Sequence, residues 1–289
     1  MEQPEEQISP LMDLHPSGRV GFVRRWRMLF QNIRTYRFFI RQLVRINILT
    51  EFKRSFIGLS WLFIVPILAV LVWILLNGAG IVEPGDTAIP YPAYVLLSTS
   101  IWGFFADIYK SSSTLFSNNG RIMIMTHFPR EVLIVEKVIV HLIRFSVPFA
   151  INLIVLLYFG VKLSWVALLF PIALIPLLLV GLGLGLIGAL LKIVAVDLSN
   201  LMDEGIRLLM FITPIVYAPK IQLGWLSDIV HLNPMTYLVG FCRDVLTQGT
   251  FYEARNYLIC SLVALVFFLF VMRIFKASES RILERLINI

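Results

Sequence analysis

Long runs without a charged residue divide this chain and decide what it can fold into. Five such runs cover residues 55–82, 87–106, 145–161, 163–191 and 256–272. A helix of about 20 mostly apolar residues crosses the apolar core of a bilayer, so each run is long enough or nearly so. Of the 289 residues, 58% are hydrophobic and 15% are charged, which excludes an ordinary soluble domain. We therefore predict an all-α polytopic membrane protein.

The positive charges gather on one predicted side of that membrane protein. The chain carries a formal net charge of +7, and twenty of its 25 Lys and Arg residues fall in segments expected on the same face. Basic residues are retained on the cytoplasmic side of bacterial membranes. The basic balance therefore indicates membrane topology and contact with anionic lipid, and it does not indicate nucleic acid.

Six transmembrane helices with both chain ends in the cytoplasm account for this pattern. The expected spans are residues 57–81, 93–108, 133–159, 165–194, 205–219 and 256–272. Between the fourth and fifth spans, Asp197, Asp203 and Glu204 are expected to form a cytoplasmic turn. The domain organisation that follows is a flexible basic arm (1–33), a cytoplasmic interface helix (34–56), the six-span domain (57–275) and a cytoplasmic tail (276–289).

The interface helix and an external helix carry the clearest local signals. Arg34, Arg37, Arg41 and Arg45 recur every three or four residues and form one stripe, as in helices that lie on an anionic lipid surface. Between spans five and six, Asn233 suits a helix N-cap and Pro234 the first helical position. The half-polar helix that follows, residues 235–248, predicts a re-entrant external element that lines a cavity.

Nucleotide and metal sites have no support in the sequence. Residues 183–188 read GLGLIG and match the dinucleotide fingerprint, but the match lies inside an apolar helix and follows no strand. Gly181 and Gly185 are spaced instead for close helix packing. No P-loop motif is present, so this chain does not hydrolyse ATP itself. We predict no catalytic residue, no metal site and no cofactor in this chain.

Two further groups of residues have competing explanations. Arg144 lies well inside the third span; it either snorkels toward the cytoplasm or pairs with an acid such as Asp107 or Glu204, with a proton relay as the alternative. Aromatic residues make up 13% of the chain. Most fit as interface anchors, whereas Trp73, Phe211 and Tyr217 could stack on sugar rings in a channel.

The stretch from Ser117 to Glu131 is a shaped, partly apolar interruption on the basic side of the chain. It begins with helix-start residues, continues through a short Met- and Ile-rich segment, and stops at Pro129. We interpret it as a docking surface for a soluble partner. Its apolar ridge would be Ile122, Met123 and Phe128, and its rim charges Arg121 and Arg130.

Three blocks, in order, resemble the membrane subunits of type-two ABC exporters of O-antigen, capsule and teichoic acid. The first runs from LVR (residues 43–45) through FKRSFIGLSW (52–61), and the second is FPRE (128–131). The third is TPIVY (213–217) followed by LNPM (232–235), and FCRD (241–244) continues it. Together they cover about residues 40–275. Glu51 and Met125 depart from the family pattern, which has basic residues there, and the arm before residue 34 has no counterpart.

The resemblance implies a homodimer of this chain with two copies of a separate ABC ATPase, which would bind the ATP and Mg²⁺, and a lipid-linked glycan as substrate. It assigns roles to three sets of residues. The ATPase-coupling set is Asn118, Gly120, Arg121, Ile122, Met123, Phe128, Pro129 and Arg130. The substrate-entrance set is Arg41, Arg45, Lys53, Arg54 and Trp61. The channel and gate set is Trp73, Phe211, Pro214, Tyr217, Asn233, Pro234 and Tyr237.

Two other functions compete with polysaccharide export. An ABC permease for a drug or a lipid would share the topology and would have a narrower, less aromatic path. An ion-coupled secondary carrier needs an acid deep in a span or broken helices in repeated halves, and the sequence has no internal repeat. All three place the chain in a membrane, which we expect to be the bacterial cytoplasmic membrane.

Overall fold

The computed structural model describes residues 31–53, 60–82, 85–126, 128–219 and 224–287, and within these ranges every regular element is a helix. The helices are α2 (Arg37–Lys53), α3 (Trp61–Gly78), α4 (Tyr91–Ser113), α5 (Leu115–Met125), α6 (Glu131–Tyr158), the 3-10 helix η2 (Trp165–Leu169), α7 (Phe170–Ala173), α8 (Ile175–Val194), α9 (Val196–Ile212), α10 (Gly224–Leu232), α11 (Pro234–Thr247) and α12 (Ala254–Ile287). The all-α prediction is confirmed for this part of the chain. Most of the predicted N-terminal arm lies outside the described residues, as does Arg54.

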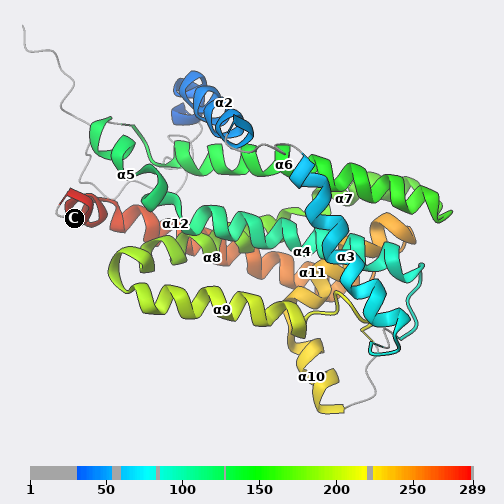
Figure 1. Cartoon of the computed structure of the whole chain (residues 1–289). Coiled ribbons are helices and arrows are strands. Elements are labelled where there is room, and N and C mark those ends of the chain that lie inside the picture. The colour runs from blue at the N-terminus through cyan, green and yellow to red at the C-terminus, as the bar shows by residue number, and fades with distance from the viewer. Residues whose placement is uncertain (1–30, 54–59, 83–84, 127, 220–223, 288–289) are drawn as a thin grey trace, which may run out of the picture.

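Helix α8 is the centre of an elongated bundle. It packs between α4 and α12, and α4 packs on its other side against α6 (Figure 1). Helix α9 runs along the edge of the bundle, while α5 and the C-terminal end of α12 lie together at one end (Figure 1). Helices α10 and α11 are set toward the opposite end (Figure 1).

Glycines on α8 allow its close approach to α4, as the sequence predicts. A Cβ atom at Gly181 would lie 2.4 Å from Ile108 Cγ2, and one at Gly185 would lie 2.5 Å from the Ser112 Cβ. Gly183, on another face, would meet the Phe267 ring of α12 at 2.6 Å. The glycine motif is therefore a packing seam for two neighbouring helices, and the dinucleotide interpretation is excluded.

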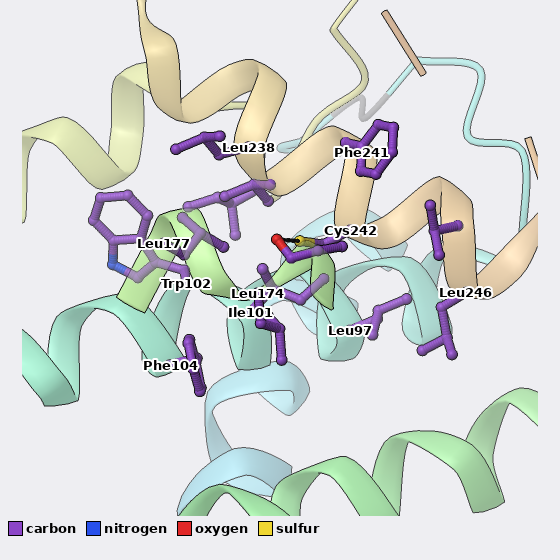
Figure 2. Close-up of a cluster of buried hydrophobic side chains, with 14 of the residues drawn as sticks. Leu97, Ile101, Trp102, Phe104, Leu174, Leu177, Leu238, Phe241, Cys242 and Leu246 are labelled. Carbon is purple, nitrogen blue, oxygen red and sulfur yellow. Dashed lines mark hydrogen bonds between the residues drawn. The ribbon is translucent and has the colours of Figure 1, made fainter. Parts of the chain in front are cut away.

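A cluster of buried apolar side chains joins α4, α7, α8 and α11 (Figure 2). Leu97 and Ile101 of α4 face Leu177 of α8, and all three are 1% exposed or less. The Cys242 thiol of α11 donates to the Ala173 carbonyl at 3.1 Å, which fixes α11 across the start of α8. Buried apolar contacts therefore hold α11 in the bundle although it is too short to span a membrane.

Three stretches of the described chain are long and apolar enough to cross a membrane: Glu131–Tyr158, Trp165–Val194 and Ala254–Ser278. They coincide with the third, fourth and sixth predicted spans. The fourth is not one regular helix, because η2, α7 and α8 follow one another with Pro171 and Pro176 at the starts of α7 and α8. These apolar helices indicate a multi-pass membrane protein.

The turn predicted to contain Asp197, Asp203 and Glu204 lies instead at Ala195, between α8 and α9. After Ala195, whose backbone is extended (φ −152°, ψ 82°), the chain enters α9 directly at Val196. Asp203 is helical, and Tyr109 and Lys192 of neighbouring helices satisfy its carboxylate. Helix α9 ends at Ile212, two residues before Pro214, because the residue before a proline avoids the helical conformation.

Candidate coupling and gating sites

Helix α5 is packed on one side and open on the other. Leu115, Phe116, Asn119 and Met123 are its buried residues. The Asn119 amide donates to the Leu115 carbonyl at 2.8 Å, so this polar side chain is satisfied within the helix. The exposed residues are Ser117, Asn118, Arg121, Ile122, Ile124 and Met125. The chain thus presents a short helix with an apolar and basic outer face.

Helix α5 packs against α12, α8 and α4, and the segments on either side of it are tied to further helices. The Phe116 ring stacks on Phe275 of α12, with 5.6 Å between ring centroids and 14° between planes. Close by, Lys276 of α12 forms an ion pair with Glu131 at the start of α6, with 2.5 Å between Nζ and Oε1. The Phe128 ring, just before α6, makes an edge contact with Phe39, next to α2's buried residues. A force on α5 would therefore act directly on α12, α8 and α4, and α6 is tied to the α12 end through Lys276.

The predicted apolar ridge is only partly on the surface. Met123 is 5% exposed and Phe128 7% exposed, and both belong to the chain's own core, so the interpretation of these two as a ridge facing a partner is wrong. Ile122 is exposed as predicted, and Ile124 and Met125 join it at 45% and 71% exposure. The helical period turns Met123 inward beside its exposed neighbours. Gly120, Pro129 and Arg130 are partly buried.

The interface helix α2 lies against α6 with its arginines outward. Ile40 and Leu43 are buried, whereas Arg37, Arg41 and Arg45 are exposed. The Asn47 amide donates to Glu136 Oε1 at 2.6 Å, and Glu136 also pairs with Lys137 at 3.3 Å. The exposed Phe38, Ile46 and Leu49 give the helix an apolar face as well. Lys53 is the last residue of α2, and Trp61, at the start of α3, is 45% exposed.

Between α9 and α10 the chain forms a non-helical segment, residues 213–218, that we call the strap. Its backbone carbonyls accept hydrogen bonds from side chains of α4. Tyr91 donates to Val216 at 3.1 Å, and Tyr94 donates to Tyr217 at 2.8 Å and to Pro214 at 3.3 Å. The strap itself is mostly buried. Side-chain donors therefore replace the regular backbone partners that a helix would provide.

Arg243 of α11 anchors the strap from the other side. It is 5% exposed, and its guanidinium donates to the Tyr94 hydroxyl at 2.8 Å and to the Pro214 carbonyl at 3.3 Å. The Asp244 carboxylate lies 3.6 Å from its Nε. The guanidinium also lies 4.4 Å from the centroid of the Tyr94 ring. Arg243 and Tyr94 thus form one buried polar unit, which the sequence-based set of site residues omits.

The predicted N-cap at Asn233 is confirmed and has a second contact. Its Oδ1 accepts from the Met235 backbone N–H at 2.9 Å, and its amide donates to Thr213 Oγ1 of the strap at 2.9 Å. Pro234 occupies the first turn of α11. The start of α11 and the strap are therefore tied together.

The remaining predicted channel residues lie in different surroundings. Phe211 is 60% exposed, on the outer side of α9. Trp73 and Tyr217 are partly buried against the core. The Tyr217 hydroxyl donates to the Phe211 carbonyl at 3.0 Å, and that of Tyr237 to the His231 carbonyl at 2.7 Å. Of the three proposed sugar-stacking rings, only Phe211 is largely open in the single chain.

Arg144 is partly buried on α6, one turn from His141, whose ring lies 4.5 Å from that of Phe104. Glu204, one of its two predicted partners, forms an ion pair with Arg207 at 2.9 Å. The pairing of Arg144 with an acid of a neighbouring helix stays a prediction. Among the described residues, no group of three or more His, Cys, Asp or Glu side chains could hold a metal ion.

Comparison with known proteins identifies the family. Residues 40–247 match the model of the ABC-2 type transporter. The chain belongs to the ABC-2 type transporter family. The match to this family runs from α2 to the last residue of α11, so it includes α5, the strap and Arg243.

Curated relatives match most of the length of the chain. It is similar to the O-antigen export system permease protein RfbA of Myxococcus xanthus, with 23% identity over 268 residues, 91% of this chain and 99% of the relative. A protein of the same name from Klebsiella pneumoniae is 26% identical over 203 residues, 69% of this chain and 76% of the relative.

Proposed function

We propose that this chain is the permease subunit of an ABC transporter that exports a lipid-linked polysaccharide across the bacterial cytoplasmic membrane. The observation that carries the proposal is the similarity to an O-antigen export permease over 91% of this chain and 99% of that relative. ATP hydrolysis would take place in a separate ATPase subunit, which would also hold ATP and Mg²⁺. The permease itself is not an enzyme.

The assembled transporter would contain two copies of this chain and two of the ATPase. Six spans are proposed, formed by α3, α4, α6, the η2–α8 stretch, α9 and α12. Both chain ends, α2 and α5 would lie in the cytoplasm, while α10 and α11 would form the external re-entrant element. The concentration of Lys and Arg in the predicted cytoplasmic segments supports this orientation.

Coupling would act through the outer face of α5. Ile122, Ile124 and Met125 offer apolar contact to the ATPase, with Arg121 beside them. Closure of the ATPase dimer on ATP would push on α5, and its contacts with α12, α8 and α4 would carry the displacement into the bundle. The strap at the other end is a defined element whose position such a displacement could change.

Substrate recognition is proposed at two places. The exposed Arg41 and Arg45 of α2 would attract the phosphate of the lipid carrier at the cytoplasmic surface, near Trp61. In the channel, Phe211 would stack on sugar rings, and Trp73 and Tyr217 would contribute if their surroundings open. The strap, with Asn233, Pro234 and Tyr237 nearby, would form the external gate.

Reconstitution of this chain with its cognate ATPase tests the proposal. Native lipid-linked glycan should stimulate ATP hydrolysis and should reach the far side of sealed vesicles. A matched control uses the same lipid carrier without the glycan. If no native glycan lipid stimulates ATP hydrolysis or crosses the vesicle membrane, the proposal of polysaccharide export is wrong.

The same vesicles separate the two alternatives. Stimulation by a drug or a glycan-free lipid, without stimulation by glycan lipid, would favour a small-molecule or lipid ABC permease. Transport that needs no ATPase and collapses with an ionophore would favour an ion-coupled carrier.

A further inference from the structure

A polar cluster joins three helices at the end of the bundle where α5 lies. The Tyr109 hydroxyl of α4 donates to Asp203 Oδ1 of α9. Lys192 Nζ of α8 lies 3.7 Å from Asp203 Oδ2 and donates to Ser113 Oγ of α4 at 3.0 Å. The side chains of Lys192 and Asp203 are 25% and 31% exposed, so water screens their pairing only in part. We call these four residues the α4–α8–α9 cluster.

On one side the cluster is built into the tightest seam of the bundle and adjoins α5. Ser113 is the last residue of α4, and α5 begins two positions later at Leu115. A Cβ atom at Gly188 of α8 would lie 3.1 Å from the Ser113 Cβ and 3.7 Å from the Tyr109 hydroxyl oxygen. A displacement of α5 therefore reaches Ser113 along the chain, and the close packing of α4 on α8 passes it to Lys192.

On the other side the cluster holds α9, a helix that packs along α8 and leaves its outer face open. Ser199 is the buried residue of α9, and Leu201, Leu208 and Phe211 are all exposed by 60% or more. From Asp203 the helix runs about 15 Å to the strap at 1.5 Å per residue. Helix α9 is thus attached to α4 by the cluster near its middle, and the strap just beyond its end is attached to α4 by the Tyr94 bonds.

Two buried hydroxyls flank the cluster without a hydrogen-bond partner in the described structure, those of Ser112 and Ser199. Ser112 lies one helical turn after Tyr109, and Ser199 one turn before Asp203. Buried polar groups are nearly always paired. The hydroxyls of Ser112 and Ser199 could therefore form new hydrogen bonds if α4 and α9 shifted slightly along each other. An element that can exchange one set of polar contacts for another has two stable arrangements.

We propose that the α4–α8–α9 cluster is the joint that transmits movement of α5 to α9 and so to the strap, with Tyr109 and Asp203 as positioning residues for transport. The inference rests on the proposed function, because it assumes that a partner ATPase moves α5. According to this inference, the four residues determine how many glycan lipids are moved per ATP hydrolysed. They are not needed for assembly of the transporter.

The test compares Tyr109→Phe with Tyr158→Phe in vesicles that contain the chain and its ATPase. Both substitutions remove one hydroxyl, but Tyr158 is 84% exposed and far from the cluster. Tyr109→Phe keeps the buried ring, so the chain should fold and bind the ATPase. We expect glycan transport per ATP to fall about tenfold, the scale of losing one hydrogen bond to a charged group, while Tyr158→Phe leaves it unchanged.

A second pair of variants separates transmission from general stability. Asp203→Asn should lower the same ratio, and the double variant with Tyr109→Phe should lower it no further than Asp203→Asn alone, because that substitution weakens the Tyr109 contact and the Lys192 ion pair together. Asp86→Asn, in an exposed loop, is the control. Lower protein yield with an unchanged ratio would show a merely structural cluster and overturn the inference.

The outcomes also distinguish the two proposals. If the unmodified transporter moves no glycan lipid, the proposed function itself fails. If it moves glycan lipid and Tyr109→Phe keeps the ratio of transport to hydrolysis, only the joint fails. Should a variant not assemble, spin labels at the exposed Lys110 of α4 and Leu201 of α9, with Cys242 and Cys260 replaced, give the answer. Their separation should change when ATP binds, and a constant separation contradicts the joint.

Discussion

At the scale of single residues, the most consequential side chain is one buried cation. Arg243 is 5% exposed and satisfies the Tyr94 hydroxyl and the Pro214 carbonyl, with Asp244 beside it. A charge in such a place is stable only while its partners stay in position. Its partners belong to α4 and the strap, so a single residue joins three separate segments.

Arg243→Met should therefore destabilise the folded chain strongly. The substitution leaves the Asp244 carboxylate buried beside unpaired groups, and the expected loss is about 3 to 5 kcal/mol. Thermal unfolding in detergent measures it. Arg255→Met removes the same charge from an exposed position at the start of α12 and should change stability by less than about 0.5 kcal/mol. Equal unfolding temperatures for the two variants would contradict the role of Arg243.

The sequence could indicate Asn233 but not Arg243. A helix cap is a local pattern, and Asn233 followed by Pro234 specifies it within two residues. The partner of Arg243 is Tyr94, 149 residues away, and nothing in either neighbourhood announces the other. The same limit applies to Asp203: its charge suggested a water-exposed turn, whereas Tyr109, 94 residues away, accommodates it in a helix.

At the scale of elements, the contact of α8 with α4 depends on glycines, which have no side chain to hold the helices apart. Apolar length alone predicts that both are helices, and the glycine spacing predicts close packing without naming the neighbour. Because Gly185 lies against both the Ser112 side chain and the Tyr109 carbonyl, even one methyl group must push the helices apart.

Gly185→Ala and Gly205→Ala should have opposite effects. A Cβ at Gly185 would lie 2.7 Å from the Tyr109 carbonyl oxygen, and such overpacking costs about 1 to 3 kcal/mol. Gly205 lies in α9 with nothing within 4 Å of its Cβ position, so alanine there should stabilise the helix by up to about 1 kcal/mol. Thermal unfolding of both proteins checks the signs. A Gly185→Ala protein as stable as the native one would rule out the seam.

Helix α5 shows why a helical period must be resolved residue by residue. Ile122 and Met123 are adjacent, yet the first faces outward and the second packs in the chain's core. The sequence correctly marked the segment as a short helix with apolar residues on a basic side. It could not assign the inner face, because the residues that cover Met123 come from distant helices.

Ile122→Asp and Met123→Asp should consequently fail in different ways. A carboxylate at the buried Met123 should destabilise the fold by more than about 3 kcal/mol and lower the amount of protein in the membrane. At the exposed Ile122 it should leave the unfolding temperature unchanged and reduce the amount of ATPase that co-purifies. The two measurements are made on the same preparations. Full recovery of the ATPase with the Ile122 variant would show that α5 is not its docking surface.

At the scale of the whole molecule, the proposed topology places α5 and the loop before α4 on opposite sides of the membrane. Single cysteines at Asn118, Asp86 and Thr250 report this, because all three positions are exposed. With Cys242 and Cys260 replaced, an impermeant maleimide should label Asp86→Cys and Thr250→Cys in intact spheroplasts, and Asn118→Cys only after permeabilisation. Labelling of all three from outside would refute the six-span arrangement.

The strap has one more consequence for the molecule as a whole. The carbonyl oxygens of Pro214, Val216 and Tyr217 are held by side-chain donors, and not by a regular backbone ladder. Any displacement of the strap takes those oxygens away from Tyr91, Tyr94 and Arg243, and the remaining available donor is water. Moving the strap therefore exposes these backbone groups to water. Osmolytes such as sucrose, which are excluded from protein surfaces, should favour the position in which the strap stays bonded to α4 and Arg243.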